Sequence, residues 1–216
     1  SRRPIRINTY GVNTNHAFSL WFTIQRLKPK HIIESGVWCG QTTWLLREAA
    51  GAKTWIYALD PMAGQQQRAL GYSDKVSGRT LYFLRKDFQD LSEVDWSSLI
   101  PVAERDSTLV VLDDHVSSTK RVRDLLAQGF VHLWYDDNFN YNYGAGDTYS
   151  FNLVCSPLPD GASNASFRDS LGNPLETISL EQHDAKVKYI AERVDIYFEF
   201  PPILNNCLRS EDSKPA

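Results

Sequence analysis

Short apolar runs rich in β-branched and aromatic residues alternate with segments of helical periodicity between residues 17 and 135. The runs predict strands at residues 31–34, 54–59, 80–84, 108–112 and 130–135. The segments between them predict helices at residues 17–27, 42–50, 65–70 and 119–128. Strands that alternate with helices are typical of βαβ units. The pattern therefore predicts an α/β fold with a mostly parallel sheet covered by helices on both faces.

The C-terminal third has a different pattern. Residues 139–186 are rich in Asn, Gly, Ser and Pro, which predicts long loops with a short helix. Residues 187–200 (VKYIAERVDIYFEF) predict one or two late strands that return to the sheet. We therefore expect an N-terminal helical cover (1–28), a main domain (29–204) with a loop-rich insertion (139–186), and a polar tail (205–216).

Composition narrows the class of protein. The chain has 216 residues, 42% of them hydrophobic and 23% charged, as expected of a single globular domain. A net charge of −3 argues against a general nucleic-acid binder. No apolar run approaches the length of a membrane span, and the N-terminal residues lack the apolar stretch of a signal peptide. Because Cys39, Cys155 and Cys207 fit neither a disulfide framework nor a CxxC zinc site, we expect reduced thiols and a cytoplasmic location.

The loop after the first predicted strand is a candidate ligand site. Gly36 and Gly40 would let the backbone turn tightly and approach a ligand, and the following helix offers free N–H groups. Glu34 could accept hydrogen bonds from an ammonium group, and Asp60, after the next strand, could bind ribose hydroxyls. A nucleotide or adenosine ligand fits this layout. A dinucleotide fits less well, because the third glycine of GxGxxG is absent and Trp38 fills the loop, and no GK[ST] indicates a P-loop.

A second set of polar residues follows the fourth and fifth predicted strands. Asp113, Asp136 and Asp137 would meet at one edge of the sheet, and their mutual repulsion would favour a bound cation. A hard divalent ion, Mg²⁺ first, suits three carboxylates and could lower the pKa of a substrate hydroxyl. His115 could accept the proton of that hydroxyl, or it could simply be a hydrogen-bond partner of the acidic residues.

The run HIIESGVWCGQTTWLL, followed by WIYALDP, resembles motif I and the second-strand acid of class I S-adenosylmethionine-dependent methyltransferases. The resemblance covers about residues 29–138 and implies a Rossmann-like, doubly wound, seven-stranded sheet with a reversed last strand. It also implies that the loop from Glu34 to Gly40 holds the methionine part of the cofactor, Asp60 the ribose, and Asp87 and Phe88 the adenine. The complete set of implied cofactor contacts is Glu34, Gly36, Trp38, Gly40, Thr42, Asp60, Asp87 and Phe88.

The acidic set is similar to that of metal-dependent sugar O-methyltransferases of the macrocin O-methyltransferase and cephalosporin-hydroxylase-like type. This resemblance implies a Mg or Mn site formed by Asp113, Asp136 and Asp137, with His115 as general base and Asp113 also catalytic. A more distant resemblance, to methyltransferase domains joined to glycosyltransferases of large algal viruses, implies a carbohydrate acceptor such as rhamnose. It also implies that the chain is part of a larger glycosyltransferase polypeptide.

Several residues carry open alternatives. Tyr143, Asp147 and Tyr149 are candidate substrate contacts on a lid within residues 139–186, and the alternative is a mobile glycine-rich loop. Asn138, just before it, is a further candidate substrate contact that could instead replace or assist a metal ligand. Asp114 is expected to be a structural acceptor, and His16 belongs to a segment that could fold over the cofactor. Lys120, Arg121 and Arg123 are expected to form a solvated helix face.

Two other functions are also compatible with the sequence. The acidic pairs would also suit a metal-dependent glycosyltransferase that grips a nucleotide-sugar diphosphate. A module that keeps the fold without catalysis would bind neither a cofactor nor a metal.

Overall fold

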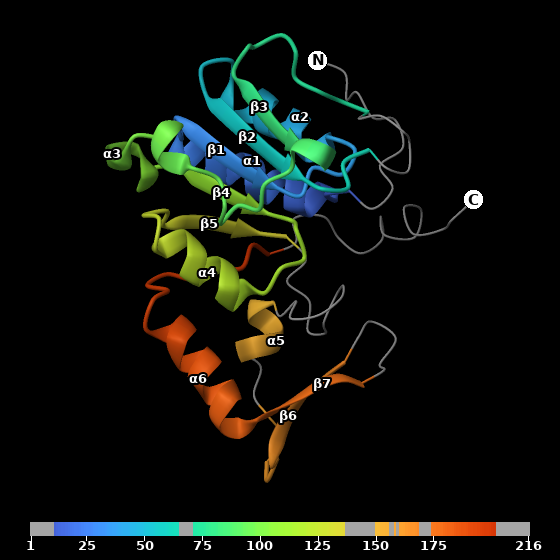
Figure 1. Cartoon of the computed structure of the whole chain (residues 1–216), viewed down its shortest axis with the longest axis vertical. Coiled ribbons are helices and arrows are strands. Elements are labelled where there is room, and N and C mark those ends of the chain that lie inside the picture. Colours follow the sequence, from blue (N-terminus) through green and yellow to red (C-terminus); the bar gives the residue numbers. More distant parts are fainter. Residues whose placement is uncertain are drawn as a thin grey trace, which may run out of the picture.

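A computed structural model describes residues 11–64, 71–136, 150–155, 158, 160–168 and 174–201. Its main element is a five-stranded parallel sheet with strand order β3-β2-β1-β4-β5 (Figure 1). The strands are β1 (His31–Ser35), β2 (Trp55–Asp60), β3 (Thr80–Leu84), β4 (Leu109–Leu112) and β5 (His132–Tyr135). Each lies within a residue or two of its predicted range, because a buried strand requires a continuous apolar run.

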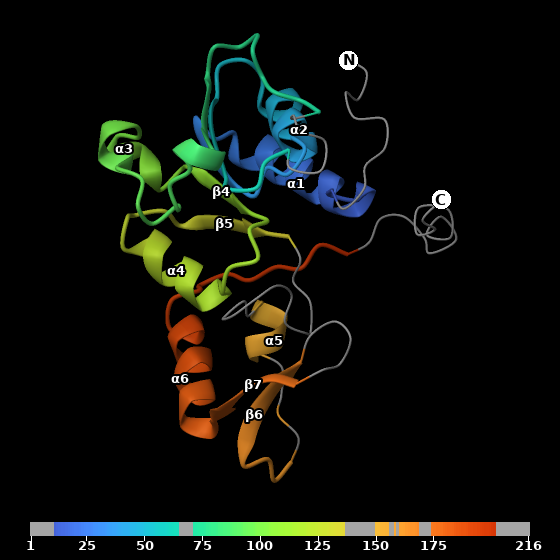
Figure 2. The same ribbon diagram turned by 45° about the vertical axis from the view of Figure 1, so that its right-hand side comes forward.

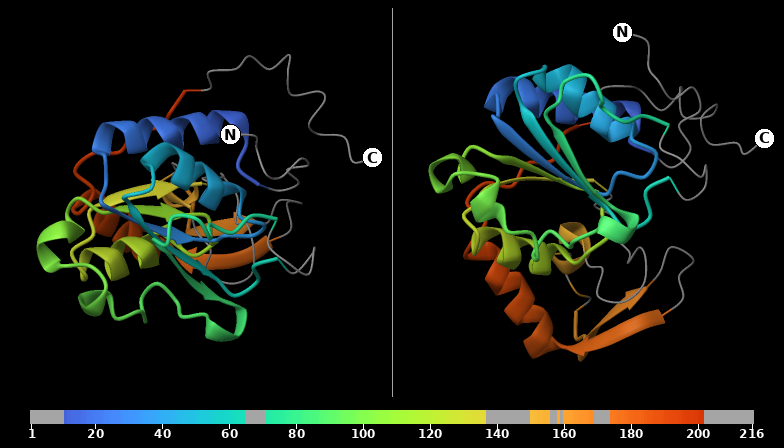
Figure 3. Two further views of the ribbon diagram at one scale, coloured as in Figure 1. Left: turned by 90° about the horizontal axis from the view of Figure 1, so that it is seen from above. Right: turned by 45° about the horizontal axis from the view of Figure 1, so that its top comes forward.

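Helices cover both faces of this sheet, as predicted (Figure 3). On one face, α1 (Thr14–Leu27) and α2 (Gln41–Ala50) bury Leu20, Ile24 and Leu46 against the sheet. On the other face lies α4 (Ser118–Leu126), whose Leu125 packs in a second core. The connection from β3 to β4 also runs along this face and contains three short helical turns: η1 (Arg85–Asp87), η2 (Trp96–Ser98) and α3 (Val102–Arg105).

Local signals set the helix ends. Asn13 caps α1 by accepting a hydrogen bond from the backbone N–H of His16. Gly51 ends α2, as the sequence predicts, and Ser117 caps α4. These residues fix where the helices begin and end, and the spacing of their apolar residues sets the face that packs on the sheet.

A smaller unit follows the sheet (Figure 2). It contains α5 (Phe151–Cys155), the antiparallel pair β6 (Asn164–Arg168) and β7 (Pro174–Ser179), and α6 (Leu180–Ala191). The short helix α5 confirms the prediction of a short helix within 139–186, but the prediction of long loops there is wrong for residues 164–168 and 174–186, which form the β6–β7 hairpin and the start of α6. Phe151 and Ile190 pack with Val122 of α4, so this unit contacts the main domain through its helices.

The prediction of seven strands in one sheet is wrong for the described residues, where the sheet has five and β6–β7 forms a separate hairpin. The predicted strands at residues 187–200 are also not found. Ser179 and Gln182 form a capping box that starts α6, and this helix continues to Ala191. Between α6 and residue 200, apolar and polar residues alternate as in a strand. However, Ile196 and Phe198 are exposed, and this segment pairs with no strand in the described ranges.

The predicted helix at 65–70 and the polar tail at 205–216 lie outside the described residues. Within the described part of the chain, Cys39 and Cys155 carry free thiols. No helix in that part combines the length and apolar character needed to cross a membrane.

Candidate cofactor and acceptor site

The parallel topology brings the predicted polar strand ends to one edge of the sheet. The backbone N–H of Asp113 donates to the carbonyl of Ser35 (2.8 Å), and that of Asp136 donates to the carbonyl of Leu112 (2.9 Å). Gly36 likewise donates to the carbonyl of Leu59 (2.9 Å). The ends of β2, β1, β4 and β5 therefore lie side by side and at the same level, at the edge where open α/β sheets bind ligands.

The winding of the sheet reverses between β1 and β4. The chain leaves β1 toward α2 on one face and leaves β4 toward α4 on the other, so the two connections diverge at this point. We call the space between the residues that follow these two strands, 36–40 and 113–116, the switch point. Such a point is the usual ligand-binding place in a doubly wound sheet.

Gly36 has a structural role at the switch point. Its φ of +97° is disfavoured for other residues, and an added Cβ would lie 2.1 Å from the carbonyl oxygen of Asp113. The predicted close approach of a ligand to this glycine remains a prediction. The structure shows that it allows close approach by the loop after β4.

Gly40 plays a comparable part. Its φ is +88°, and an added Cβ would lie 2.3 Å from the carbonyl oxygen of Tyr72. The backbone N–H of Tyr72 also donates to the carbonyl of Cys39 (3.2 Å), and that of Gly64 donates to the carbonyl of Trp38 (2.8 Å). The connection between β2 and β3 therefore lies against the loop and holds its shape.

Asp60 holds the same loop from the end of β2. Its Oδ2 accepts hydrogen bonds from the backbone N–H groups of Val37 (2.9 Å) and Trp38 (2.6 Å). Its Oδ1 accepts from the backbone N–H of Met62 (2.5 Å). Trp38 adopts a left-handed backbone (φ +51°), which these contacts stabilise. The predicted role of Asp60 in ribose binding remains a prediction, and its observed role is to organise the loop.

Glu34 is the most unusual carboxyl group at this edge. It lies on β1, is fully buried, and accepts a hydrogen bond from the Thr43 hydroxyl at Oε2 (2.6 Å). Burial, opposed in part by Thr43 and reinforced by the nearby charge of Asp60, raises the pKa of Glu34 from 4.5 to about 8. Its Oε1 is buried and has no hydrogen-bond partner among the described residues. This atom would be satisfied by a donor on a bound molecule.

The remaining cofactor candidates lie near this loop or farther along the edge. Thr42 is buried in the first turn of α2. Asp87 is exposed in η1 at the end of β3, and Phe88 is half-buried against the core on the α4 face. The structure therefore places these three residues at the predicted end of the sheet, without testing their contacts to a cofactor.

Two of the three predicted metal ligands lie on adjacent strand ends, Asp113 after β4 and Asp136 after β5. Asp136 Oδ1 contacts Nδ1 of His16, which comes from the first turn of α1. The third candidate, Asp137, lies outside the described residues. Within the described ranges, no group of three His, Cys, Asp or Glu side chains is arranged to hold a metal ion.

His115 lies in the loop after β4, where its side chain is exposed. Its backbone is left-handed (φ +54°), an uncommon conformation that His tolerates better than most residues. An exposed imidazole on a constrained turn at the switch point can exchange protons with a substrate.

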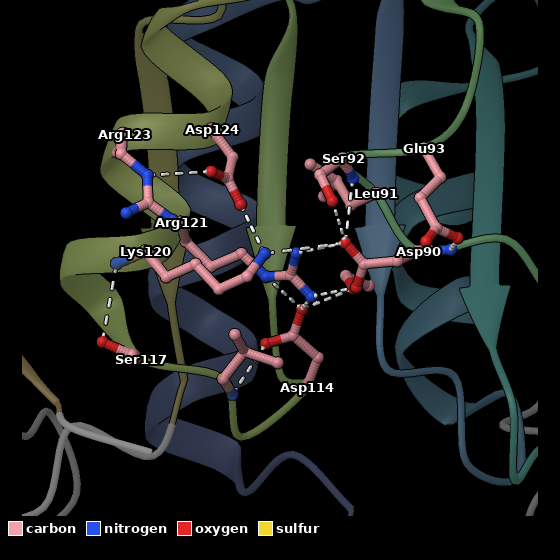
Figure 4. A network of polar contacts seen from close by, with 12 residues as sticks. Asp90, Leu91, Ser92, Glu93, Asp114, Ser117, Lys120, Arg121, Arg123 and Asp124 are labelled. Atoms are coloured by element: carbon pink, nitrogen blue, oxygen red, sulfur yellow. Dashed lines mark hydrogen bonds and ion pairs between the residues drawn. The ribbon is translucent and has the colours of Figure 1, made fainter. Parts of the chain in front are cut away.

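Asp114 has the structural role that the sequence analysis expected. Its Oδ2 accepts hydrogen bonds from the Ser35 hydroxyl (2.6 Å) and from Nε of Arg121 (2.9 Å). The prediction that Arg121 belongs to a solvated helix face is wrong. This side chain is only 1% exposed and also binds Asp90 (Figure 4). Burial of an arginine is tolerated here because two carboxylates face it.

The pairing of Arg121 with Asp90, 31 residues away, is not predicted by the sequence pattern. Neither is the contact between His16 and Asp136, although the His16 segment is predicted to lie near the cofactor. Among these contacts, only the one between Asp114 and Arg121 could have been suspected from sequence spacing, because the two residues are seven positions apart across the start of α4. The candidate substrate residues Asn138, Tyr143, Asp147 and Tyr149 lie outside the described residues.

Comparisons of the chain with protein-family models, with curated proteins and with solved structures find no match. A functional assignment therefore depends on the residues at the switch point and on the sheet that positions them.

Proposed function

We propose that this chain is an S-adenosylmethionine-dependent O-methyltransferase that acts on a sugar hydroxyl. The observation that carries the proposal is Glu34, a buried carboxyl group with one unpartnered oxygen at the end of the central strand. It lies beside the glycine loop and the switch point, where a doubly wound sheet binds its ligand. S-adenosylmethionine supplies an electrophilic methyl group on a positively charged sulfur.

Glu34 would accept a hydrogen bond from the amino group of the cofactor at Oε1. A positive charge there would favour the ionised carboxylate, which burial disfavours in the free protein. Asp60 keeps Val37 and Trp38 in place, so the loop is organised before the cofactor binds. A preformed loop lowers the entropic cost of binding.

The acceptor side of the reaction belongs to the loop after β4. His115 would take the proton from the acceptor hydroxyl, so that the oxygen could bond to the methyl carbon while the carbon–sulfur bond breaks and S-adenosylhomocysteine leaves. Asp113, Asp136 and Asp137 would hold Mg²⁺ or Mn²⁺, which acidifies and orients a bound hydroxyl. The support for this ion is the alignment of Asp113 with Asp136 on neighbouring strands. Asn138, Tyr143, Asp147 and Tyr149 are the proposed contacts to the sugar.

Calorimetry with S-adenosylhomocysteine and a mass-spectrometric search for methylated products on a glycan panel test the proposal. We expect saturable binding that Glu34→Gln weakens, and a product heavier by one methylene unit. Binding of UDP or GDP without binding of S-adenosylhomocysteine would instead identify a nucleotide-sugar enzyme. Absence of all three interactions would leave only a non-catalytic module.

A further inference from the structure

Arg121 joins the loop after β4 to the turn at Asp90, which is distant in the sequence. Its Nε donates to Asp114 Oδ2 (2.9 Å), and its two terminal nitrogens donate to the two oxygens of Asp90 (3.0 and 2.9 Å). One of these nitrogens also lies 2.8 Å from Asp114 Oδ2. All three guanidinium nitrogens are therefore engaged, and Figure 4 shows the group between the two carboxylates.

The Asp114 side of this network reaches the switch point. Asp114 accepts from the Ser35 hydroxyl at the end of β1, and its Oδ1 accepts from the backbone N–H of Val116 (3.1 Å). Asp113 and His115 directly flank Asp114 in the chain. The network thus fixes the turn in which His115 has its left-handed backbone.

Asp90, at the other side of the network, is held in place by its own neighbours. Asp90 accepts from the backbone N–H (3.0 Å) and the hydroxyl (2.6 Å) of Ser92. Leu91, next to it, is fully buried, and its carbonyl accepts from the indole N–H of Trp96 (2.9 Å). Burial acts to raise the pKa of Asp90, but hydrogen bonds from Arg121 and Ser92 outweigh it and keep the pKa well below its usual value. Asp90 therefore remains a charged partner for Arg121 at neutral pH.

We propose that Arg121 is a positioning residue for the reaction. It ties the loop that carries Asp113 and His115 to the end of β1 and to the anchored turn at Asp90. A lysine would keep the positive charge, but its single ammonium group cannot reproduce the planar fork that spans two carboxylates. The catalytic consequence of this proposal rests on the proposed function, whereas the structural consequence does not.

Hydrogen–deuterium exchange of the cofactor-free protein tests the structural part. The informative amides are those of Asp113, which donates to the Ser35 carbonyl, and Val116, which donates to Asp114. In Arg121→Lys we expect both to exchange roughly tenfold faster or more, the change that follows when local opening becomes easier by about 1.4 kcal/mol. Asp90→Asn should also accelerate exchange at both amides, but by a smaller factor, because the contact between Arg121 and Asp114 remains.

Two controls separate positioning from general loss of stability. Arg123→Lys changes an exposed arginine on the same helix and should leave exchange at Asp113 and Val116 unchanged. Arg47→Lys weakens another buried arginine–carboxylate pair, with Asp74 (2.7 Å). It should accelerate exchange near residues 74–80 and not at Asp113 or Val116. Two results for Arg121→Lys would overturn the proposal. One is amide exchange that accelerates equally throughout β1, β4 and β5, and the other is unchanged exchange at Asp113 and Val116.

Activity measurements test the catalytic part. Arg121→Lys should lower kcat for methyl transfer about tenfold or more while the Kd for S-adenosylhomocysteine changes less, because the partners of Arg121, Asp90 and Asp114, are not among the proposed cofactor contacts. If the wild-type protein transfers no methyl group, the proposed function fails and the exchange result still stands. If methyl transfer occurs but Arg121→Lys changes neither kcat nor amide exchange, the positioning role fails alone.

Discussion

A Cβ atom added at Gly36 would lie 2.1 Å from the carbonyl oxygen of Asp113. The loops that follow β1 and β4 are thus in backbone contact at the point where the sheet reverses its winding. The same two loops carry the groups that we propose for the cofactor and for the acceptor. The two loops can lie this close together because residue 36 has no side chain.

Gly36→Ala should therefore destabilise the fold. The added methyl group meets a main-chain atom that cannot rotate away, and φ of +97° adds backbone strain. Together these costs amount to about 2–4 kcal/mol in the free energy of unfolding, measured by urea denaturation. Gly78→Ala is the control, because its φ is also positive (+64°) but nothing lies within 4 Å of an added Cβ. Equal losses in both variants would contradict the close contact.

Glu34 should make stability depend on pH. Its pKa is about 8 in the folded protein and 4.5 ordinarily, so the folded state favours the protonated form. The stability that this group contributes is complete below pH 4.5 and is lost as pH rises through about 8. The separation corresponds to at most roughly 5 kcal/mol. Glu34→Gln should stabilise the protein above pH 8 and change little near pH 4.5, as read from unfolding midpoints across this range. A wild-type profile identical in shape to that of the variant would refute this assignment.

Cofactor binding should release a proton from the same group. At neutral pH the free protein holds Glu34 largely protonated, and an amino group placed at Oε1 would favour its ionised form. Affinity for S-adenosylhomocysteine should rise between pH 6 and pH 8. Calorimetry in buffers of different ionisation enthalpy measures the released proton directly. In Glu34→Gln the contribution of this group to proton release should disappear, whereas in Glu48→Gln, an exposed matched change, it should persist.

Chelation should separate the two halves of the proposed site. EDTA, and the substitution Asp113→Asn, should lower methyl transfer by about 100-fold or more while binding of S-adenosylhomocysteine persists. Asp124→Asn changes a carboxylate that contacts Lys120 on α4 and should retain turnover. Full turnover in EDTA would exclude the metal while leaving the cofactor proposal intact.

The sequence by itself determined the five strands and the helices that cover them. Each strand of a buried parallel sheet must be apolar along its whole length, so its position can be predicted from the local sequence. The parallel order then required the polar residues after each strand to meet at one edge, as Asp113 and Asp136 do. The C-terminal unit was harder to predict, because α6 begins at a capping box while residues 187–200 carry a strand-like pattern.

Only the tertiary structure decided what the individual polar residues do. Arg121 was expected to be solvated, but it is buried because Asp114 and Asp90, the latter 31 residues away in the sequence, converge on it. Gly36 and Asp60 have the residue types of a ligand loop, yet their observed partners are Asp113 and the loop itself. Periodicity reports which face of an element is buried. Which polar groups meet there depends on how separate elements pack, and the local pattern does not encode that.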